Sequence, residues 1–111
     1  MSKRLWGEFK VLSRSKKFLV KKLVIYPKSR TSLQYHEFRN EYWIVLDGKG
    51  KAVVNKKKKN IKKGDMIVVK EKQVHRIENP YKKNLIILEI WVGEKLKESD
   101  IVRLKDDYGR V

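Results

Sequence analysis

The chain has 111 residues, of which 29 are Lys or Arg and 13 are Asp or Glu, so its formal net charge is +16. Hydrophobic residues make up 41% and aromatic residues 10% of the chain, which is enough to build a core and argues against disorder. The absence of Cys excludes a disulfide scaffold, a thiolate zinc finger and a cysteine nucleophile, and the length predicts a single domain over residues 1–111.

Segments rich in β-branched and aromatic residues recur along the chain, and turn signals separate them. In chain order, strands are predicted at 18–26, 32–36, 41–46, 51–55, 65–69, 75–79 and 84–92. A hairpin tip is predicted at Asn55–Asn60, which contains four consecutive lysines. No segment carries an apolar stripe of helical period for a dozen residues, although Ser99 or Asp100 could begin a short helical turn. Many short, evenly spaced strands indicate an all-β barrel or a double-sheet jelly roll.

The positive charge comes mostly from lysine, with 22 Lys against 7 Arg. Proteins that read nucleic acids rely on Arg, whose guanidinium forks onto phosphate and guanine. We therefore expect no nucleic-acid partner, and we rank polyanion binding third among the candidate functions. A lysine-rich surface is typical of proteins from heat-loving organisms, and a small phosphorylated substrate is also compatible with the charge.

Two further features concern location. The N-terminal stretch MSKRLWGEFK lacks the apolar core of a signal peptide. The longest apolar run, Leu85–Val92, is interrupted by Glu89 and is too short to span a bilayer. We therefore expect a cytoplasmic protein with no membrane partner.

The chain has only two histidines, His36 and His75, and polar residues surround each of them. Gln34 and His36 share one face of a predicted strand, and a hairpin to the next strand could bring Glu41 beside them. Imidazole, carboxylate and amide donors suit a divalent cation such as zinc, manganese, iron or nickel. Without thiolates, an open catalytic or binding site is the better metal interpretation; the alternative is that each histidine is only packed.

These residues resemble the two cupin motifs: Gln34-Tyr35-His36 with Glu41 and Gly48, then Gly64 with His75 and Asn79. The chain is more specifically similar to the cupin domain of type II mannose-6-phosphate isomerases, often fused to a mannose-1-phosphate guanylyltransferase. The similar segments are RLWG (4–7), FLVKKLVIYP (18–27), SLQYH (32–36) with Arg39, Glu41 and Trp43, HRIENP (75–80) and DIVRLKDDYGR (100–110).

The resemblance implies a single-domain cupin, which is a double-stranded β-helix or jelly-roll barrel. It implies one divalent metal ion, zinc first and manganese, iron or nickel otherwise, held by Gln34, His36, Glu41 and His75. It implies interconversion of mannose 6-phosphate and fructose 6-phosphate through an enediol, with a small sugar phosphate as the partner. A homodimer is expected, because cupins commonly pair through exposed edge strands.

Several further residues are candidates for catalysis. Arg110 could pair with phosphate or with the enediolate, and Lys21 could add a second cation unless it faces outward as an edge residue. The base could be Glu37, Glu41 or Glu89, of which Glu89 lies on an apolar strand face. Arg39 and Arg76 are predicted to make surface ion pairs, and Trp6, Trp43 and Trp91 are predicted to lie in the core or an interface.

The chain departs from the family at Glu37, Phe38 and Tyr42, where histidines are usual, and at Lys28, where glycine is usual. The four ligand positions are retained. These departures favour an alternative function, a non-catalytic metal-binding cupin that binds a sugar, a sugar phosphate or a nucleotide sugar.

Overall fold

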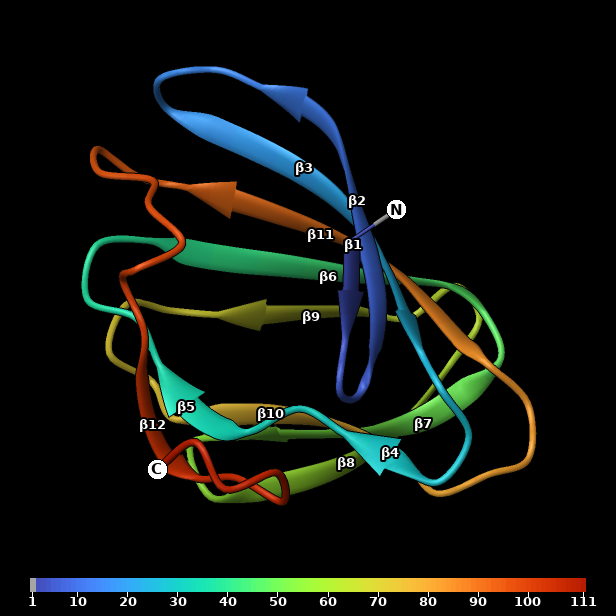
Figure 1. Ribbon diagram of the computed structural model, residues 1–111. Coiled ribbons are helices and arrows are strands. Elements are labelled where there is room, and N and C mark those ends of the chain that lie inside the picture. Colours follow the sequence, from blue (N-terminus) through green and yellow to red (C-terminus); the bar gives the residue numbers. More distant parts are fainter. Residues whose placement is uncertain (1) are drawn as a thin grey trace.

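Residues 2–111, which the computed structural model describes, form twelve strands and no helix. The strands are β1 (Ser2–Arg4), β2 (Gly7–Arg14), β3 (Phe18–Ile25), β4 (Ser29–Arg30), β5 (Leu33–Tyr35), β6 (Asn40–Asp47), β7 (Lys49–Val54), β8 (Lys57–Lys62), β9 (Met66–Val69), β10 (His75–Asn79), β11 (Leu85–Val92) and β12 (Val102–Lys105). They build two facing antiparallel sheets (Figure 1). The all-β jelly-roll architecture predicted from the sequence is confirmed.

The first sheet has the order β1-β2-β3-β11-β6-β9, and the second has the order β12-β5-β10-β7-β8, with β4 beside β10. Strand β11 is central to the first sheet because it pairs along its whole length with β3 and over nearly as much of its length with β6. Its alternate residues Leu85, Ile87, Glu89 and Trp91 are buried, so one acidic side chain lies on an otherwise apolar inner face.

Positive backbone φ angles explain two of the tight turns. Gly48, between β6 and β7, has φ +80, and an added Cβ would lie 2.5 Å from the Asn84 carbonyl oxygen. Asn55 and Lys56 have φ 51 and 70, which makes a two-residue hairpin between β7 and β8. The hairpin tip is therefore shorter than predicted, and the lysines at 57–59 are exposed members of β8.

No helical turn begins at Ser99 or Asp100, so that expectation is wrong; the chain makes a single turn at residues 97–100, closed by a hydrogen bond from the Asp100 amide to the Lys97 carbonyl. Residues 93–101 instead cross from the end of β11 to the other sheet, where β12 pairs with β5 (orange to red in Figure 1). The Asp100 carboxylate accepts the backbone amides of Glu37 and Phe38 at 2.9 and 3.0 Å, so it fastens a distant loop and does not cap a helix of its own segment.

The buried residues divide into two sets. An apolar cluster forms the core and includes Ile25, Trp43, Val45, Leu85 and Ile87. A second set is polar, and its members are Lys21, Thr31, Ser32, His36, Arg39, Glu41, His75, Arg76, Asn79 and Glu89. Most of this polar set lines one cavity inside the barrel, where any chemistry would occur. Within residues 2–111 there is also no helix that could cross a membrane.

Candidate metal centre

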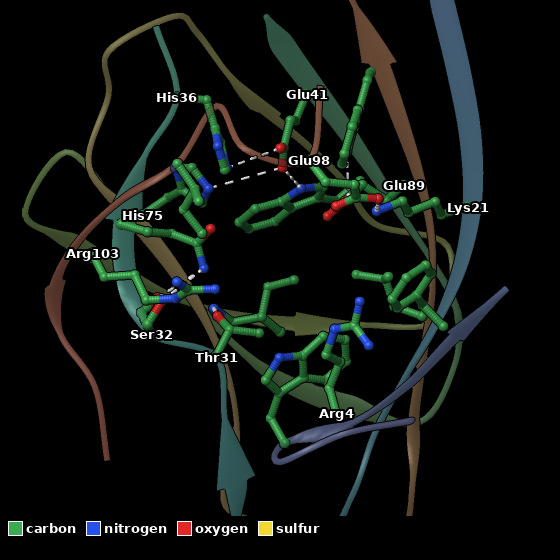
Figure 2. A pocket seen from close by; sticks show the side chains of 18 of the residues that line it. Arg4, Lys21, Thr31, Ser32, His36, Glu41, His75, Glu89, Glu98 and Arg103 are labelled. Atoms are coloured by element: carbon green, nitrogen blue, oxygen red, sulfur yellow. Dashed lines mark hydrogen bonds and ion pairs between the residues drawn. The ribbon is translucent and has the colours of Figure 1, made fainter. Parts of the chain in front are cut away.

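Three predicted ligands converge inside the barrel (Figure 2). One ligand atom from each of His36, Glu41 and His75 lies within 4.8 Å of the others, and all three side chains are buried. His36 Nε2 is 3.2 Å from Glu41 Oε2, and His75 Nε2 is 3.9 Å from Glu41 Oε1. The sequence suggested that a hairpin brings His36 to Glu41, but β5 and β6 lie in opposite sheets and form no hairpin. The loop after β5 carries the chain across the barrel.

Both imidazoles are oriented by backbone carbonyls. His36 Nδ1 lies 2.6 Å from the Asp100 carbonyl oxygen, and His75 Nδ1 lies 2.9 Å from that of Gln73. Because a carbonyl can only accept, Nδ1 carries the proton in each ring and Nε2 keeps its lone pair toward Glu41. Burial lowers the pKa of His36 to about 4 and also lowers that of His75, so both rings are neutral at pH 7. Neutral rings are the form that binds metals.

Glu41 supplies the anionic donor. Burial opposes its ionised form, but His75, Arg39 and His36 outweigh burial and lower the pKa of Glu41 to about 2, a pH at which both rings are protonated. At pH 7, where the rings are neutral, the Arg39 guanidinium 2.8 Å away stabilises the carboxylate. Trp43 Nε1 donates to Oε1 at 3.0 Å. Two neutral imidazoles and one carboxylate form a donor set that suits zinc or another borderline divalent ion.

Gln34, the fourth predicted ligand, faces His75 across the β5–β10 ladder and lines the same cavity. Its amide nitrogen donates to Ser32 Oγ at 3.1 Å and to the Ser32 carbonyl at 3.2 Å. The amide oxygen is therefore the atom that Gln34 would offer to a metal ion.

Arg39 lies inside the centre and makes no surface ion pair, so the sequence interpretation was wrong for it. It is only 5% exposed, its Nε donates to Glu41 Oε2 at 2.8 Å, and one terminal nitrogen lies 3.2 Å from His36 Nε2. Its guanidinium carbon stacks 3.4 Å from the centre of the Trp91 ring. Arg39 follows the end of β5, where strand alternation no longer predicts which way a side chain points.

Arg76 is also buried, at 6% exposed, and its Nε donates to the Thr31 carbonyl at 3.0 Å. The expectation that it makes a surface ion pair is therefore wrong as well. It lies on β10 next to His75 but does not line the cavity, because consecutive residues of a strand face opposite sides.

The cavity of about 230 Å³ also receives Lys21, Glu89 and Arg110. Lys21 does not face outward: its Nζ is 2.5 Å from Glu98 Oε1 and 4.0 Å from the centre of the Trp91 ring. Burial, and then the charge of Glu41, raise the pKa of Glu89 to about 8, so its side chain carries a proton at neutral pH.

The two remaining catalytic candidates from the sequence, Arg110 and Glu37, differ in whether they line the cavity. Arg110 lines the cavity while making two bonds to the Asp106 carboxylate, at 2.7 and 3.0 Å. Glu37 is exposed and does not line the cavity, so nothing in the geometry supports it as a base.

The sequence pointed to no functional role for four residues that the structure places at or beside this cavity: Arg4, Arg103, Glu98 and Asp100. The quoted segments RLWG and DIVRLKDDYGR contain three of them, so a signal was present. What each side chain does depends on contacts across the barrel, which no local pattern reveals.

Comparison with known proteins agrees with this architecture. The family model described as mannose-6-phosphate isomerase C-terminal matches residues 1–106. A mannose-1-phosphate guanylyltransferase of Klebsiella pneumoniae is 36% identical over 107 residues, which cover 96% of this chain and 23% of the relative. The chain therefore spans less than a quarter of that relative's length.

Solved structures show the same fold at low identity. A conserved protein with a double-stranded β-helix domain, from Klebsiella pneumoniae, has a TM-score of 0.80 and 16% identity over 96% of this chain and 85% of its own. The cupin domain of Cnp3 from Schizosaccharomyces pombe has a TM-score of 0.77 and 15% identity over 81% of this chain and 66% of its own. The predicted cupin fold is thus confirmed.

Proposed function

Because the chain belongs to the family described as mannose-6-phosphate isomerase C-terminal, we propose that it is a metal-dependent sugar-phosphate isomerase. The proposed reaction interconverts mannose 6-phosphate and fructose 6-phosphate. The observation that carries the proposal is the convergence of His36, Glu41 and His75, with both Nδ1 atoms held by backbone carbonyls. Guanylyl transfer, which the relative's name describes, belongs to a protein more than four times as long.

A divalent metal ion would be held by His36, Glu41 and His75, and the amide oxygen of Gln34 would be the fourth protein donor. Zinc is the first candidate, and manganese, iron or nickel would suit the same donors. When bound, such an ion polarises the carbonyl and hydroxyl oxygens of the open-chain sugar as a Lewis acid.

The residues of the chain supply the rest of the chemistry. The reaction moves a proton from C2 to C1 of the sugar, and a hydroxyl proton from O2 to O1. The ionised form of Glu89, which is the minor form at pH 7 because its pKa is about 8, accepts the C2 proton and returns it to C1. Trp91 Nε1, 2.7 Å from Oε1, fixes the orientation of this carboxylate. The cations of Arg39 and Lys21 offset the negative charge that develops on the enediol oxygens.

Glu41 is not the base in this mechanism. Its Oε2 already accepts from Arg39 and its Oε1 from Trp43, and it is the only carboxylate of the three converging ligands. Within residues 2–111, Glu89 accepts one hydrogen bond, through Oε1, which leaves its other oxygen available to the substrate.

The proposal is tested by assaying metal-loaded protein for the interconversion, together with metal content by elemental analysis. His75→Ala should lose both metal and turnover. Glu89→Gln should keep the metal and lose about 10²- to 10⁴-fold in kcat, as expected for a missing general base. Lys105→Met, on the exposed face of β12, should change neither.

Absence of turnover in the metal-loaded wild-type protein would refute the isomerase. If that protein still bound a hexose phosphate saturably, the alternative of a non-catalytic sugar-binding cupin would replace it. The alternative rests on Glu37, Phe38 and Tyr42, where the family has histidines, but Glu37 and Phe38 are exposed and none of the three lines the cavity.

A further inference from the structure

The cationic side chains that line the cavity do not all have partners. Three of them are paired: Arg39 with Glu41 at 2.8 Å, Lys21 with Glu98 at 2.5 Å, and Arg110 with Asp106 at 2.7 Å. The remaining two are Arg4 and Arg103. Within residues 2–111, no carboxylate lies within 4.0 Å of either guanidinium.

Arg103 reaches the cavity from β12. It faces Gln34 across the β12–β5 ladder, and both side chains line the cavity. Its Nε is buried and has no hydrogen-bond partner in the described chain. A buried, charged donor without an acceptor is unfavourable by itself, because it has lost water and gained nothing in return.

Arg4 reaches the same space from the β1–β2 hairpin. Its guanidinium carbon lies 4.6 Å from the centre of the Phe9 ring, and within residues 2–111 its guanidinium donates one hydrogen bond, to the Lys3 carbonyl. Figure 2 shows Arg4 and Arg103 on the side of the cavity away from Glu41. The cavity therefore has His36 and Glu41 toward one end and two unpaired guanidiniums toward the other, and Gln34 lies between Arg103 and His75 in the strand register.

The mutual repulsion of these cations is consistent with a missing anion. Burial, followed by the charges of Arg110 and Arg4, lowers the pKa of Arg103. A phosphate monoester carries a charge of about −1.5 to −2 at pH 7 and offers three oxygens. Two guanidiniums, each with a planar fork of donors, match that charge and geometry better than they match a neutral sugar hydroxyl.

We propose that Arg103 and Arg4 bind the phosphoryl group of a small sugar phosphate, whose opposite end then lies at His36, Glu41 and His75. The proposal deepens the proposed function and rests on it for the identity of the sugar. Arg110, which the sequence suggested for phosphate, already binds the Asp106 carboxylate and has less positive charge to offer.

The test measures binding by calorimetry on the metal-loaded full chain. The probes are mannitol 6-phosphate, which has no carbonyl and cannot isomerise, and mannitol, which also lacks the phosphate. Wild-type protein should bind the phosphorylated probe much more tightly than mannitol. Arg103→Met should weaken binding of mannitol 6-phosphate about 10- to 100-fold, the usual effect of losing hydrogen bonds to a charged group, and leave mannitol unchanged.

Lys105→Met is the matched control, because it removes one positive charge from the same strand without touching the cavity. It should leave the affinity for mannitol 6-phosphate within about twofold of wild type, as expected for a solvent-exposed charge. If Arg103→Met does not fold, Arg4→Met serves in its place, since Arg4 lies on an exposed strand, and it should weaken the same probe.

Equal affinities for the two probes in wild-type protein, or equal losses in Arg103→Met and Lys105→Met, would overturn the phosphate subsite. The outcomes also separate this proposal from the isomerase. Loss of phosphate selectivity in Arg103→Met together with no turnover in wild type would support the subsite and refute the enzyme. Turnover that survives with unchanged affinity in Arg103→Met would do the reverse.

Discussion

The raised pKa of Glu89 predicts a measurable pH dependence of stability. This residue is only 8% exposed and lies on the inner face of β11, between the buried residues Ile87 and Trp91. Burial, and then the negative charge of Glu41, raise its pKa to about 8 from an ordinary value of 4.5. The folded protein therefore keeps a proton between these two pH values that the unfolded chain has already released.

The sign of the effect follows from proton linkage. Because the folded state binds more protons than the unfolded state between pH 4.5 and 8, the free energy of unfolding falls as pH rises through this window. The stabilising contribution is complete below pH 4.5 and lost by pH 8. A shift of 8 − 4.5 = 3.5 pH units at 1.36 kcal/mol per unit gives a ceiling of about 5 kcal/mol.

Glu89→Gln removes the titration while keeping the shape and an acceptor for Trp91 Nε1. The variant should unfold at similar urea concentrations to wild type at pH 5 and become increasingly more stable than wild type up to pH 8. Urea unfolding at unit steps from pH 5 to 9, with a chelator and constant ionic strength, measures this difference. Glu94→Gln, at an exposed position, is the control and should show no such trend. A wild-type-to-Glu89→Gln difference that stays flat from pH 5 to 8 would refute the reasoning.

Three further predictions concern Arg39, Asn79 and Gly48. Arg39→Met should destabilise the metal-free protein by about 3–5 kcal/mol, because the buried carboxylate of Glu41 loses its cationic partner. Zinc, which would replace that positive charge, should therefore raise Tm more in this variant than in wild type. An equal or smaller rise would contradict the role of Arg39 as the counter-charge of Glu41. Asn79 is fully buried, and its amide donates to two backbone carbonyls at 2.9 and 2.7 Å. Asn79→Ala should therefore lower the free energy of unfolding in urea by about 2–4 kcal/mol. A decrease under about 0.5 kcal/mol, the range of a surface substitution, would show that water replaces the amide. Gly48→Ala should lower thermal stability by about 1–3 kcal/mol because of its positive φ and the approach of the new Cβ to the Asn84 carbonyl, and an unchanged Tm would mean that the turn relaxes freely.

The sequence predicted the main strands well where apolar residues alternate with others. Strands β3, β6 and β11 lie within two residues of their predicted bounds, because one face of each is buried. Strands β1, β2, β4, β8 and β12 were not predicted. In β8, for example, Lys57–Lys62 contains a single buried apolar residue, Ile61, so the sequence shows little alternation, although the strand pairs along its length with β7.

The candidate site shows the same division. His36 and His75 could be singled out because the chain has no other histidine and both fit a known motif. Arg39 and Lys21 could not be placed, because the groups that surround them come from distant parts of the chain. Lys21, for example, pairs with Glu98, which is 77 residues away. The alternation of apolar and polar residues along a strand predicts whether a side chain can point inward. It does not predict whether a distant segment supplies an ion-pair partner for that side chain.

Asp100 connects the candidate centre to the chain that crosses the barrel wall. Its carbonyl oxygen holds the His36 ring, and its carboxylate holds the amides of Glu37 and Phe38. A metal ion that binds His36 in this orientation therefore stabilises the conformation in which residues 93–101 lie against the barrel. By thermodynamic reciprocity, that conformation raises the affinity for the metal ion by the same factor. Metal loading should accordingly slow hydrogen–deuterium exchange at the amides of Glu37 and Phe38, which makes this crossing segment a reporter of occupancy that works without any substrate.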